Sequence, residues 1–343
     1  MNVNNLIEKA NSLRGCLAHR RTISSRRRHD KSEELLTIGN QFVDDEHRLF
    51  ASKTYRLLRA KTQVFTFPRN AFIRSRQAHV MEVVGYAAIT AEMLGLNIDL
   101  VRAAAIGHDM GHVPFGHQGE FWMQKAMGKP NFCHEVMGVV IAQKIERRGH
   151  GLNLTWHTLD AMMRHSGEFA AETMSQEAWI LRYADKIAYI FHDINDILVR
   201  TRYPLSAEII TLAGEFGNTQ RERTFTAIAA LVVESTELGR VSFEHSELGQ
   251  KFQRLRKLML DVYPRVTRQD VDSILSPVLD FVTKLNVCNP FLLLAMMTDE
   301  DAAQLASAQM IDMEVFNRTS ISEIMPYLRE IGDVDLCDSD LNW

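Results

Sequence analysis

Apolar side chains recur at helical spacing along most of the chain from about residue 45 onward. One run covers residues 73–94 and ends near Gly95, and the next covers 98–107, with Asp99 near its start. Further helices are predicted at 131–148, 156–164, 177–198, 206–215, 219–239, 247–263, 266–285 and 320–331. Only residues 64–67 suggest a strand, and the sequence has no evident internal repeat. The predicted fold class is therefore all-α.

The expected organisation has three parts with no flexible linker between them. Residues 1–44 form a basic N-terminal arm, 45–240 a helical core, and 241–343 a C-terminal helical region packed on the core. Within 14–32, seven basic residues face a single acidic one. We favour a solvated, partly disordered arm. The alternatives are an arm that binds phosphate or single-stranded nucleic acid, or one that reaches a neighbouring subunit.

Composition narrows the protein class. The chain has 343 residues and a formal net charge of −4, so no global attraction to nucleic acid or membranes is expected. No apolar run reaches the roughly 18 residues of a membrane span, and the N-terminal residues lack the apolar core of a signal peptide. The four cysteines lie far apart, which suits reduced thiols. These features predict a cytoplasmic protein without membrane contact.

The candidate chemistry is concentrated in residues 108–120, HDMGHVPFGHQGE. The adjacent His108 and Asp109 offer an imidazole nitrogen and a carboxylate oxygen to one cation. Three glycines and Pro114 then turn the chain tightly, which could bring His117 and Glu120 back over the same place. A plain core helix has no use for such a run.

Two further residues complete a candidate metal site. His79 and Asp185 each lie on a stretch with helical periodicity, one upstream and one downstream of the His-Asp pair. Together with His108 and Asp109 they provide two imidazoles and two carboxylates, which suit a first-row divalent ion such as Mn, Fe, Ni or Zn better than Ca. Such a set leaves coordination positions open for water and a substrate oxygen.

The order H…HD…D resembles the HD-domain metal-dependent phosphohydrolases. More narrowly, residues 108–120 resemble the HDLGHPPFGHxGE signature of the deoxynucleoside triphosphate triphosphohydrolases, the dGTPase-like family. Segments 55–58, 61–65, 74–83, 131–135 and 183–196 continue the likeness in the same order. The resemblance spans roughly residues 45–200 and implies the HD-domain helical phosphohydrolase fold, with 45–240 as the HD-domain catalytic core.

The resemblance also implies roles for residues in the signature. His117 and Glu120 match the family's catalytic dyad, with His117 as general acid for the leaving 5′ oxygen and Glu120 orienting it. His134 matches an active-site histidine and is expected to contact phosphate. For His112, in a tight turn, we favour a structural role.

A triphosphate carries about four negative charges near neutral pH, so charge-assisted donors must surround it. Arg56, Lys61, Arg76 and Lys186 are the candidates. Lys186 departs from many bacterial relatives, which carry an aspartate there. It agrees instead with the mammalian dNTPases that join a sterile-alpha motif to an HD domain.

That agreement extends along the D-K-x-x-Y-x-x-x-D pattern of residues 185–193. It implies that Lys186 contacts phosphate, that Tyr189 stacks near the deoxyribose, and that Asp193 contacts the 3′-hydroxyl. Gln63 matches a glutamine that reads the same hydroxyl. A tyrosine packed under C2′ would exclude a ribose 2′-hydroxyl sterically.

The expected activity is hydrolysis of a dNTP, with dGTP as the favoured candidate, to deoxynucleoside and tripolyphosphate. A divalent cofactor (Mn, Mg, Fe, Ni or Zn) and a homo-oligomer, either hexamer or tetramer, are expected by resemblance. One alternative is an HD-domain nucleotidase or phosphodiesterase acting on dNMPs or other phosphoesters, although the basic candidates favour a longer polyphosphate. Another is a nucleic-acid-binding or regulatory protein that kept the fold. The intact metal set argues against that as the sole role.

Overall fold

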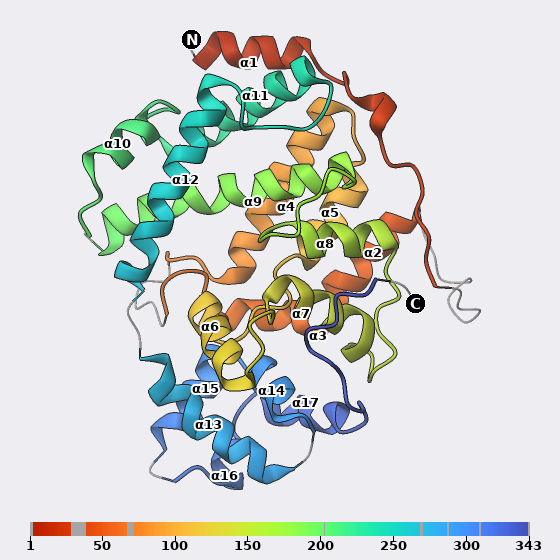
Figure 1. Ribbon diagram of the computed structural model, residues 1–343, viewed down its shortest axis with the longest axis vertical. Coiled ribbons are helices and arrows are strands. Elements are labelled where there is room, and N and C mark those ends of the chain that lie inside the picture. Colours follow the sequence, from red (N-terminus) through yellow and green to blue (C-terminus); the bar gives the residue numbers. More distant parts are fainter. Residues whose placement is uncertain are drawn as a thin grey trace.

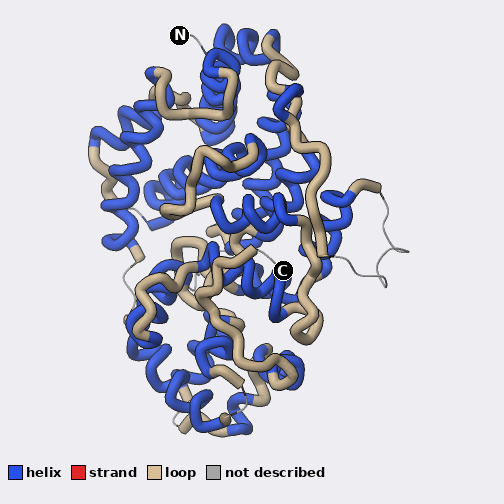
Figure 2. Tube along the Cα trace, turned by 45° about the vertical axis from the view of Figure 1, so that its right-hand side comes forward, coloured by secondary structure: helices blue, strands red, loops and turns tan. Residues whose placement is uncertain are grey.

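A computed structural model describes residues 3–28, 39–66, 72–201, 203–267, 270–286, 288–308 and 310–341. Within these residues the protein has seventeen α-helices and no strand, apart from one isolated antiparallel bridge between Thr62 and Ser75 (Figures 1 and 2). The all-α prediction is confirmed. Residues 64–66 form no strand, contrary to expectation, and residue 67 lies outside the described residues.

The α-helices have these bounds: α1 Val3–Ser12, α2 Gln41–Ala51, α3 Lys53–Leu57, α4 Arg76–Leu94, α5 Ile98–Gly107, α6 Gly116–Met127, α7 His134–Val140, α8 Trp156–Arg164, α9 Gln176–Asn195, α10 Ala207–Gly214, α11 Gln220–Leu238, α12 Glu247–Val266, α13 Val271–Leu285, α14 Pro290–Ala295, α15 Asp299–Ser307, α16 Met313–Phe316 and α17 Ile321–Leu328. Short 3₁₀ turns cover Ala18–Arg20 and Leu58–Ala60. Turns of π-helix cover Ile141–Ile145 and Asp196–Thr201.

Local capping sets most of these boundaries. The Ser75 side chain accepts a hydrogen bond from the Ala78 amide at the start of α4, and Gly95 ends the helix in the left-handed region with φ +76°. The Asn97 side chain caps α5 in the same way. The predicted helix at 266–285 starts later, at Val271, because α12 continues through Pro264 to Val266.

Helices α4, α5 and α9 form the centre of the upper part of the molecule (Figure 1). Helix α5 packs against α2, α4, α8 and α9. Small residues make this possible, since Ala103, Ala104 and Ala105 are fully buried and allow close approach. At Gly107 an added Cβ would lie 2.7 Å from the Met162 sulfur. The C-terminal end of α5 therefore lies deep in the core.

The C-terminal helices divide between the two halves of the molecule. Helix α12 packs against α9, α10 and α11 in the upper part, whereas α13–α17 form the lower part, with α13 packed against α6 and α15 (Figure 1). The region 241–343 therefore does not pack as one block on the core. Among the described helices, none is long and apolar enough to cross a membrane.

The basic segment before residue 29 lies along the molecular surface rather than free in solvent. The Trp156 amide donates to the Arg26 carbonyl oxygen at 2.9 Å, and the Arg27 guanidinium pairs with Asp44 and Asp45. The Thr22 amide donates to Glu177 at 2.9 Å. Residues 18–28 are therefore held against the surface rather than disordered, although the side chains of Arg20, Arg21, Arg26 and Arg28 are exposed, as expected of a solvated arm. Residues 29–38 lie outside the described residues.

Asp45 is the buried anchor of this arrangement, and its removal should destabilise the protein. Its carboxylate accepts from the Thr155 amide at 3.0 Å and from the Thr155 and Thr158 hydroxyls at 2.6 and 2.7 Å. Asp45→Ala leaves these donors unpaired, so the free energy of unfolding should fall by about 2–4 kcal/mol. Urea denaturation measures this. The exposed Glu247→Ala is the control, and an equal loss in both variants would contradict the assignment.

Candidate active site

Three helices bring the four predicted metal-binding residues together in the core. His79 comes from α4, His108 and Asp109 follow the last turn of α5, and Asp185 comes from α9; all four are buried. His79 Nε2 lies 3.1 Å from Asp185 Oδ1 and 3.9 Å from Asp109 Oδ2. His108 Nε2 lies 3.5 Å from Asp109 Oδ1 and 3.8 Å from Asp185 Oδ1. His79, His108 and Asp109 lie close enough together to hold one ion, and Asp185 Oδ1 lies within 3.8 Å of both imidazole Nε2 atoms.

The hydrogen bonding of His108 fits a metal ligand. Its Nδ1 lies 2.7 Å from the Ala105 carbonyl oxygen, so Nδ1 carries the proton and Nε2 keeps its lone pair. That buried Nε2 has no hydrogen-bond partner among the described residues. A cation at the centre of the quartet would satisfy it. Two imidazoles and two carboxylates are a donor set for a first-row divalent ion.

The charge of Asp109 is balanced from one side by Arg76. The Arg76 Nη1 donates to Asp109 Oδ2 at 2.7 Å, and its Nε donates to the Thr62 carbonyl oxygen at 3.0 Å. Burial alone would raise the pKa of the Asp109 carboxyl, but His108 and Arg76 hold it well below its usual range. Asp109 is therefore an anion in the core, as a metal ligand must be.

A tight loop carries the chain from Asp109 to α6 and brings α7 against it. A Cβ on Gly111 would lie 2.0 Å from the His134 carbonyl oxygen, so only glycine permits this contact. Phe115 and Gly116 both have positive φ, at 67° and 57°, and they reverse the chain into α6. The loop thus places His117 and Glu120 of α6 beside His134 of α7.

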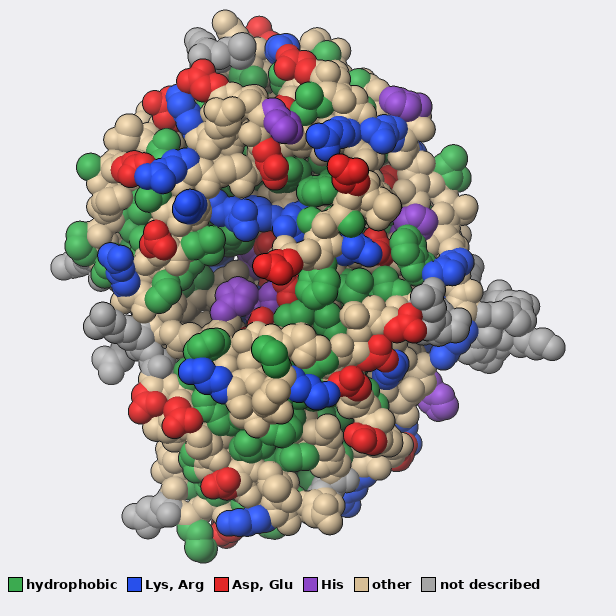
Figure 3. Space-filling model, viewed as in Figure 1, with side chains coloured by type: hydrophobic (Ala, Val, Ile, Leu, Met, Phe, Trp, Pro, Cys, Tyr) green, Lys and Arg blue, Asp and Glu red, His purple; other side chains and the backbone are tan. Residues whose placement is uncertain are grey.

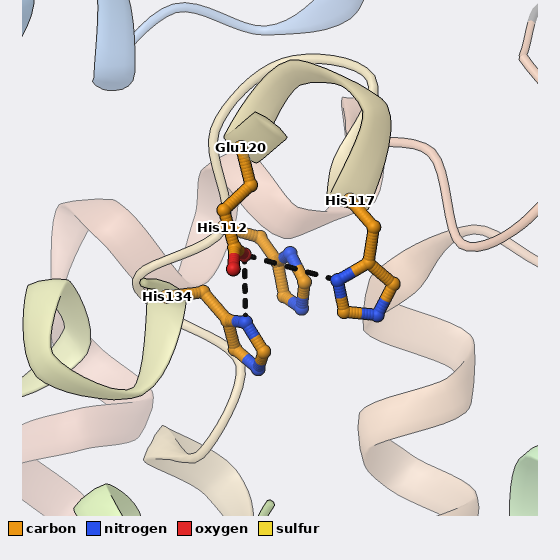
Figure 4. A group of neighbouring side chains, drawn as sticks. All are labelled: His112, His117, Glu120 and His134. Carbon is orange, nitrogen blue, oxygen red and sulfur yellow. Dashed lines mark hydrogen bonds and ion pairs between the residues drawn. The ribbon is translucent and has the colours of Figure 1, made fainter. Parts of the chain in front are cut away.

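His112, His117, Glu120 and His134 form a second cluster next to the metal quartet (Figure 4). Glu120 Oε2 lies 2.8 Å from His134 Nδ1 and 3.8 Å from His117 Nδ1, so it reaches toward both rings. The rings of His112 and His134 stack with centroids 3.8 Å apart. The predicted dyad of His117 and Glu120 therefore includes a third member, His134.

The charges in this cluster support one another. Burial opposes the charged form of His134, but Glu135 and Glu120 raise its pKa to about 9. Burial also opposes ionisation of Glu120, but His134 and His117 hold its pKa well below its usual range. His134 and Glu120 are therefore an ion pair near neutral pH, and the His117 side chain, 74% exposed, lies toward solvent.

A cavity of about 250 Å³ joins the two clusters. Figure 3 shows it as a hollow with histidine side chains inside and basic side chains along its upper edge. Its lining includes these predicted site residues: Gln63, Arg76, His79, Asp109, His117, His134, Asp185, Lys186, Tyr189 and Asp193. His108 and Glu120 lie behind this surface. The structure thus brings most of the predicted residues to one place.

Two predicted phosphate contacts lie elsewhere. Arg56 is exposed on α3, and its Nη2 donates to the Ala51 carbonyl oxygen at 3.1 Å. Lys61 is buried below the loop, where its Nζ donates to the carbonyl oxygens of His112 and Ala295. Neither side chain is part of the described cavity lining. Their charge and position in the sequence suggested these residues. In the structure, however, the Arg56 side chain is exposed, and the Lys61 ammonium group is bonded to backbone carbonyl oxygens.

Helix α12 contributes cavity residues that the sequence motifs did not reveal. Arg256 and Tyr263 line the cavity. The Tyr263 hydroxyl donates to Asp193 Oδ2 at 2.9 Å, and the Tyr263 and Tyr189 rings lie 6.3 Å apart. Their only sequence signal is an ordinary amphipathic helix, which does not show which residues face a site.

His165, at the end of α8, also escaped the sequence analysis. Its Nδ1 lies 2.7 Å from the Met162 carbonyl oxygen, and its Nε2 lies 3.4 Å from His134 Nε2. Burial together with the neighbouring His108 and His134 lowers the pKa of His165 to about 4. The sequence did contain a pattern that could have identified His165. This histidine follows the last residue of a helix and precedes Gly167, as His108 follows the last residue of α5 and precedes Gly111.

Basic side chains also line the cavity, with Lys186 coming from α9 and Arg256 from α12. Lys186 is buried on α9, and its Nζ donates to the Arg182 carbonyl oxygen at 2.9 Å. Burial, with the nearby charges of Arg182 and Arg256, holds the pKa of Lys186 well below its usual range. An anionic group in the cavity would relieve this repulsion.

Comparison with known proteins identifies the family. The HD domain family model matches residues 76–190. A deoxyguanosinetriphosphate triphosphohydrolase-like protein of Clostridium perfringens strain SM101 is 34% identical over 267 residues, which cover 74% of this chain and 77% of that protein. The chain belongs to the deoxyguanosinetriphosphate triphosphohydrolase-like family.

Other members of this family match a shorter part. The protein so named in Caldanaerobacter subterraneus subsp. tengcongensis is 38% identical over 188 residues, 54% of this chain and 55% of that protein. The one in Desulfatibacillum aliphaticivorans is 36% identical over 211 residues, 58% and 59% of the two chains. The matched segment thus spans little more than half the length of these two relatives. Family membership supports a phosphohydrolase, and the His and Asp clusters described above suit its metal.

Replacing a metal ligand should abolish metal binding while the fold persists. His108→Ala should lower metal affinity by about a hundredfold or more, since losing even an outer partner of a ligand costs about 10- to 100-fold. Elemental analysis after dialysis measures this, with exposed His245→Ala as control. Full metal content in His108→Ala would remove His108 from the ligand set.

The buried Lys61 should make stability depend on pH. Burial lowers the pKa of Lys61 to about 7 in the folded protein, whereas in the unfolded chain its pKa is that of an ordinary lysine, about 10.4. Between these values the unfolded state binds more protons, so folding stability rises with pH. From pH 7 to 9 the wild type should gain about 2 kcal/mol relative to Lys61→Met, measured by urea denaturation. Parallel pH profiles for the two proteins would contradict this.

Proposed function

We propose that this protein is a metal-dependent dNTP triphosphohydrolase that cleaves a dNTP to deoxynucleoside and tripolyphosphate, with dGTP as the first substrate to test. One observation carries the proposal. Three of the four metal-ligand candidates, the three histidines of the Glu120 cluster and a basic wall formed by Lys186 and Arg256 line the same cavity of about 250 Å³. Relatives bearing the dGTP triphosphohydrolase-like name support the same activity.

The metal centre would be held by His79, His108, Asp109 and Asp185. A bound divalent ion (Mn, Mg, Fe, Ni or Zn) supplies Lewis acidity and lowers the pKa of bound water. The protein positions the four ligand side chains and buries them away from solvent. Arg76 contributes by pinning the Asp109 carboxylate at 2.7 Å, which leaves its other oxygen facing the histidines.

The Glu120 cluster would handle the proton that the leaving 5′ oxygen needs. His117 lies in the cavity wall with its ring open to substrate, and Glu120 Oε2 lies 3.8 Å from its Nδ1. A carboxylate at that position stabilises the protonated ring, so His117 can act as general acid. His134 carries a positive charge near neutral pH and would contact phosphate.

The basic wall would hold the rest of the polyphosphate. Lys186 and Arg256 line the same cavity as Asp109. Arg76 lines it too, but its guanidinium is engaged by Asp109 and by the Thr62 carbonyl. Arg56 and Lys61 take no part in this proposal.

The sugar would lie between α9, α12 and the segment before α4. Asp193 is held by Arg74 Nη2 at 2.7 Å and by the Tyr263 hydroxyl at 2.9 Å, so its position is fixed before substrate arrives. Gln63 Oε1 is buried without a hydrogen-bond partner among the described residues. Both side chains suit a 3′-hydroxyl, and Tyr189 would exclude a 2′-hydroxyl.

Assembly into a hexamer or tetramer is proposed from the resemblance alone. A role of the basic arm in binding single-stranded nucleic acid has less support. Within the described part of the arm, Arg27 is already paired with Asp44 and Asp45. Residues 18–28 instead fasten the N-terminus to α8 and α9 through Trp156 and Glu177.

The decisive experiment is product analysis. The purified protein is incubated with each dNTP, singly and mixed, with Mn or Mg, and products are resolved by ion-exchange chromatography. Deoxynucleoside and tripolyphosphate are expected. His117→Ala should lower the rate by about 10²- to 10⁴-fold, the usual contribution of a general acid.

Two comparisons make this experiment specific. Arg56→Ala removes an exposed charge outside the cavity and should keep wild-type activity. A dNMP panel tests the alternative of a nucleotidase or phosphodiesterase. Cleavage of monophosphates without turnover of any dNTP, in protein that holds metal, would replace the present proposal with that one.

A further inference from the structure

A carboxylate from the lower part of the molecule reaches the active-site loop. Asp299 is the first residue of α15, far in sequence from every metal-ligand candidate, and it is buried. Its Oδ1 accepts from the Phe115 amide at 2.9 Å. Its Oδ2 accepts from the Thr62 amide at 3.0 Å and from the Thr62 hydroxyl. One side chain therefore holds two separate segments of the upper part.

The first of these segments carries the proposed general acid. Phe115 immediately precedes α6 and has φ 67°, a conformation that non-glycine residues rarely adopt. Its side chain makes no capping hydrogen bond. A strained residue persists only where its surroundings fix it, and the bond from Asp299 to the Phe115 amide does so. His117 follows two residues later and Glu120 one turn after that.

The second segment leads to the metal quartet. The Thr62 carbonyl oxygen accepts from Arg76 Nε at 3.0 Å. The same guanidinium donates from Nη1 to Asp109 Oδ2 at 2.7 Å. Asp299 is thus connected to a metal-ligand candidate through Thr62 and Arg76, and to the general acid through Phe115. Asp299 therefore connects the candidate metal site with the proposed general acid.

A neighbouring contact strengthens the same junction. Lys61 Nζ donates to the Ala295 carbonyl oxygen at the end of α14 and to the His112 carbonyl oxygen in the loop. The α14–α15 corner is therefore connected to the loop directly at Phe115 and, through Lys61, at His112. Both contacts are buried, so water cannot easily replace either of them.

We propose that Asp299 is a positioning residue, which rests on the proposed function: it fixes the spacing between the metal quartet and His117 by holding Phe115 and Thr62 at once. Asp299 does not line the cavity, so it acts on the reaction through these partners. The lower helices are then part of the catalytic apparatus.

The expected effect lies in turnover rather than in binding. Asp299→Ala leaves the Phe115 and Thr62 amides without their acceptor, so the loop relaxes and His117 moves. A displacement of about 1 Å is expected to lower kcat about a hundredfold. Most residues proposed to bind polyphosphate and sugar lie on α9 and α12, and only Gln63 is next to a partner of Asp299, so KM should change by no more than about threefold.

The matched control is Asp301, two residues further along the same helix. It is equally buried and accepts hydrogen bonds from the Thr298 and Ser320 amides, but neither bond reaches the site. Asp301→Ala should lower Tm about as much as Asp299→Ala while leaving kcat at the wild-type value. Asp299→Asn keeps one acceptor oxygen and should recover about tenfold of the lost kcat, since it can still bind one of the two amides.

The experiment compares wild type, Asp299→Ala, Asp299→Asn and Asp301→Ala by kcat, KM, metal content and Tm. A loss of kcat confined to the Asp299 variants, with metal content retained, supports the proposal. Wild-type kcat in Asp299→Ala, or an equal loss in Asp301→Ala, overturns it. If Asp299→Ala does not fold, Asp299→Asn decides, and unchanged kcat in that variant overturns the proposal. If the wild-type protein hydrolyses no dNTP, the proposed function itself is wrong, which is a different outcome from failure of the Asp299 proposal.

Discussion

The Asp109 carboxylate is an anion in the middle of a helical core, and the surrounding structure follows from the need to balance it. A buried charge is tolerated only where partners replace its hydration. Arg76 supplies one partner at 2.7 Å, and His112 presents its Nε2 at 3.3 Å from the other oxygen. The alanine-rich face of α5 and the glycines of the loop permit these groups to converge. The close packing around Asp109 is therefore what allows its charge to be balanced.

The charged side chains around the cavity suit an anionic substrate. The carboxylates Asp109, Asp185 and Asp193 line the cavity together with the basic side chains of Arg76, Lys186 and Arg256. Helix α9 contributes both a carboxylate and a basic group to the cavity, because the side chains of the adjacent residues Asp185 and Lys186 have different partners. Asp185 bonds to His79, whereas Lys186 turns back toward the Arg182 carbonyl. A substrate with its reactive phosphorus near the metal and its outer phosphates near the lysine would meet attraction at both ends.

The sequence predicted the parts of the site whose residues carry distinctive chemistry in a fixed order. The all-α class, the ends of α4 and α5, and the convergence of His79, His108, Asp109 and Asp185 were accessible because spacing and residue type limit them strongly. Arg56 and Lys61 show the limit of that reasoning. A positive charge near a motif does not reveal whether its side chain points to the cavity, to solvent, or to two carbonyl groups.

Other features required the fold. Arg256 and Tyr263 reach the cavity because α12 crosses α9, a tertiary arrangement that amphipathic periodicity does not encode. Residues 18–28 lie on the surface of the core because Asp45 and Glu177 offer buried acceptors, and a basic composition did not reveal these contacts. The lower helices likewise looked featureless in sequence, although Asp299 connects them to the loop.

The distance in sequence between Asp299 and the loop has a consequence for biosynthesis. At translation rates of about 5–20 residues per second, domains that fold during synthesis do so from the N-terminus. His79, His108, Asp109 and Asp185 leave the ribosome several seconds before Asp299. The nascent chain can therefore gather its metal ligands while Phe115 still lacks the acceptor that holds it. Under the proposed function, the ability to bind metal would then precede catalytic competence during synthesis.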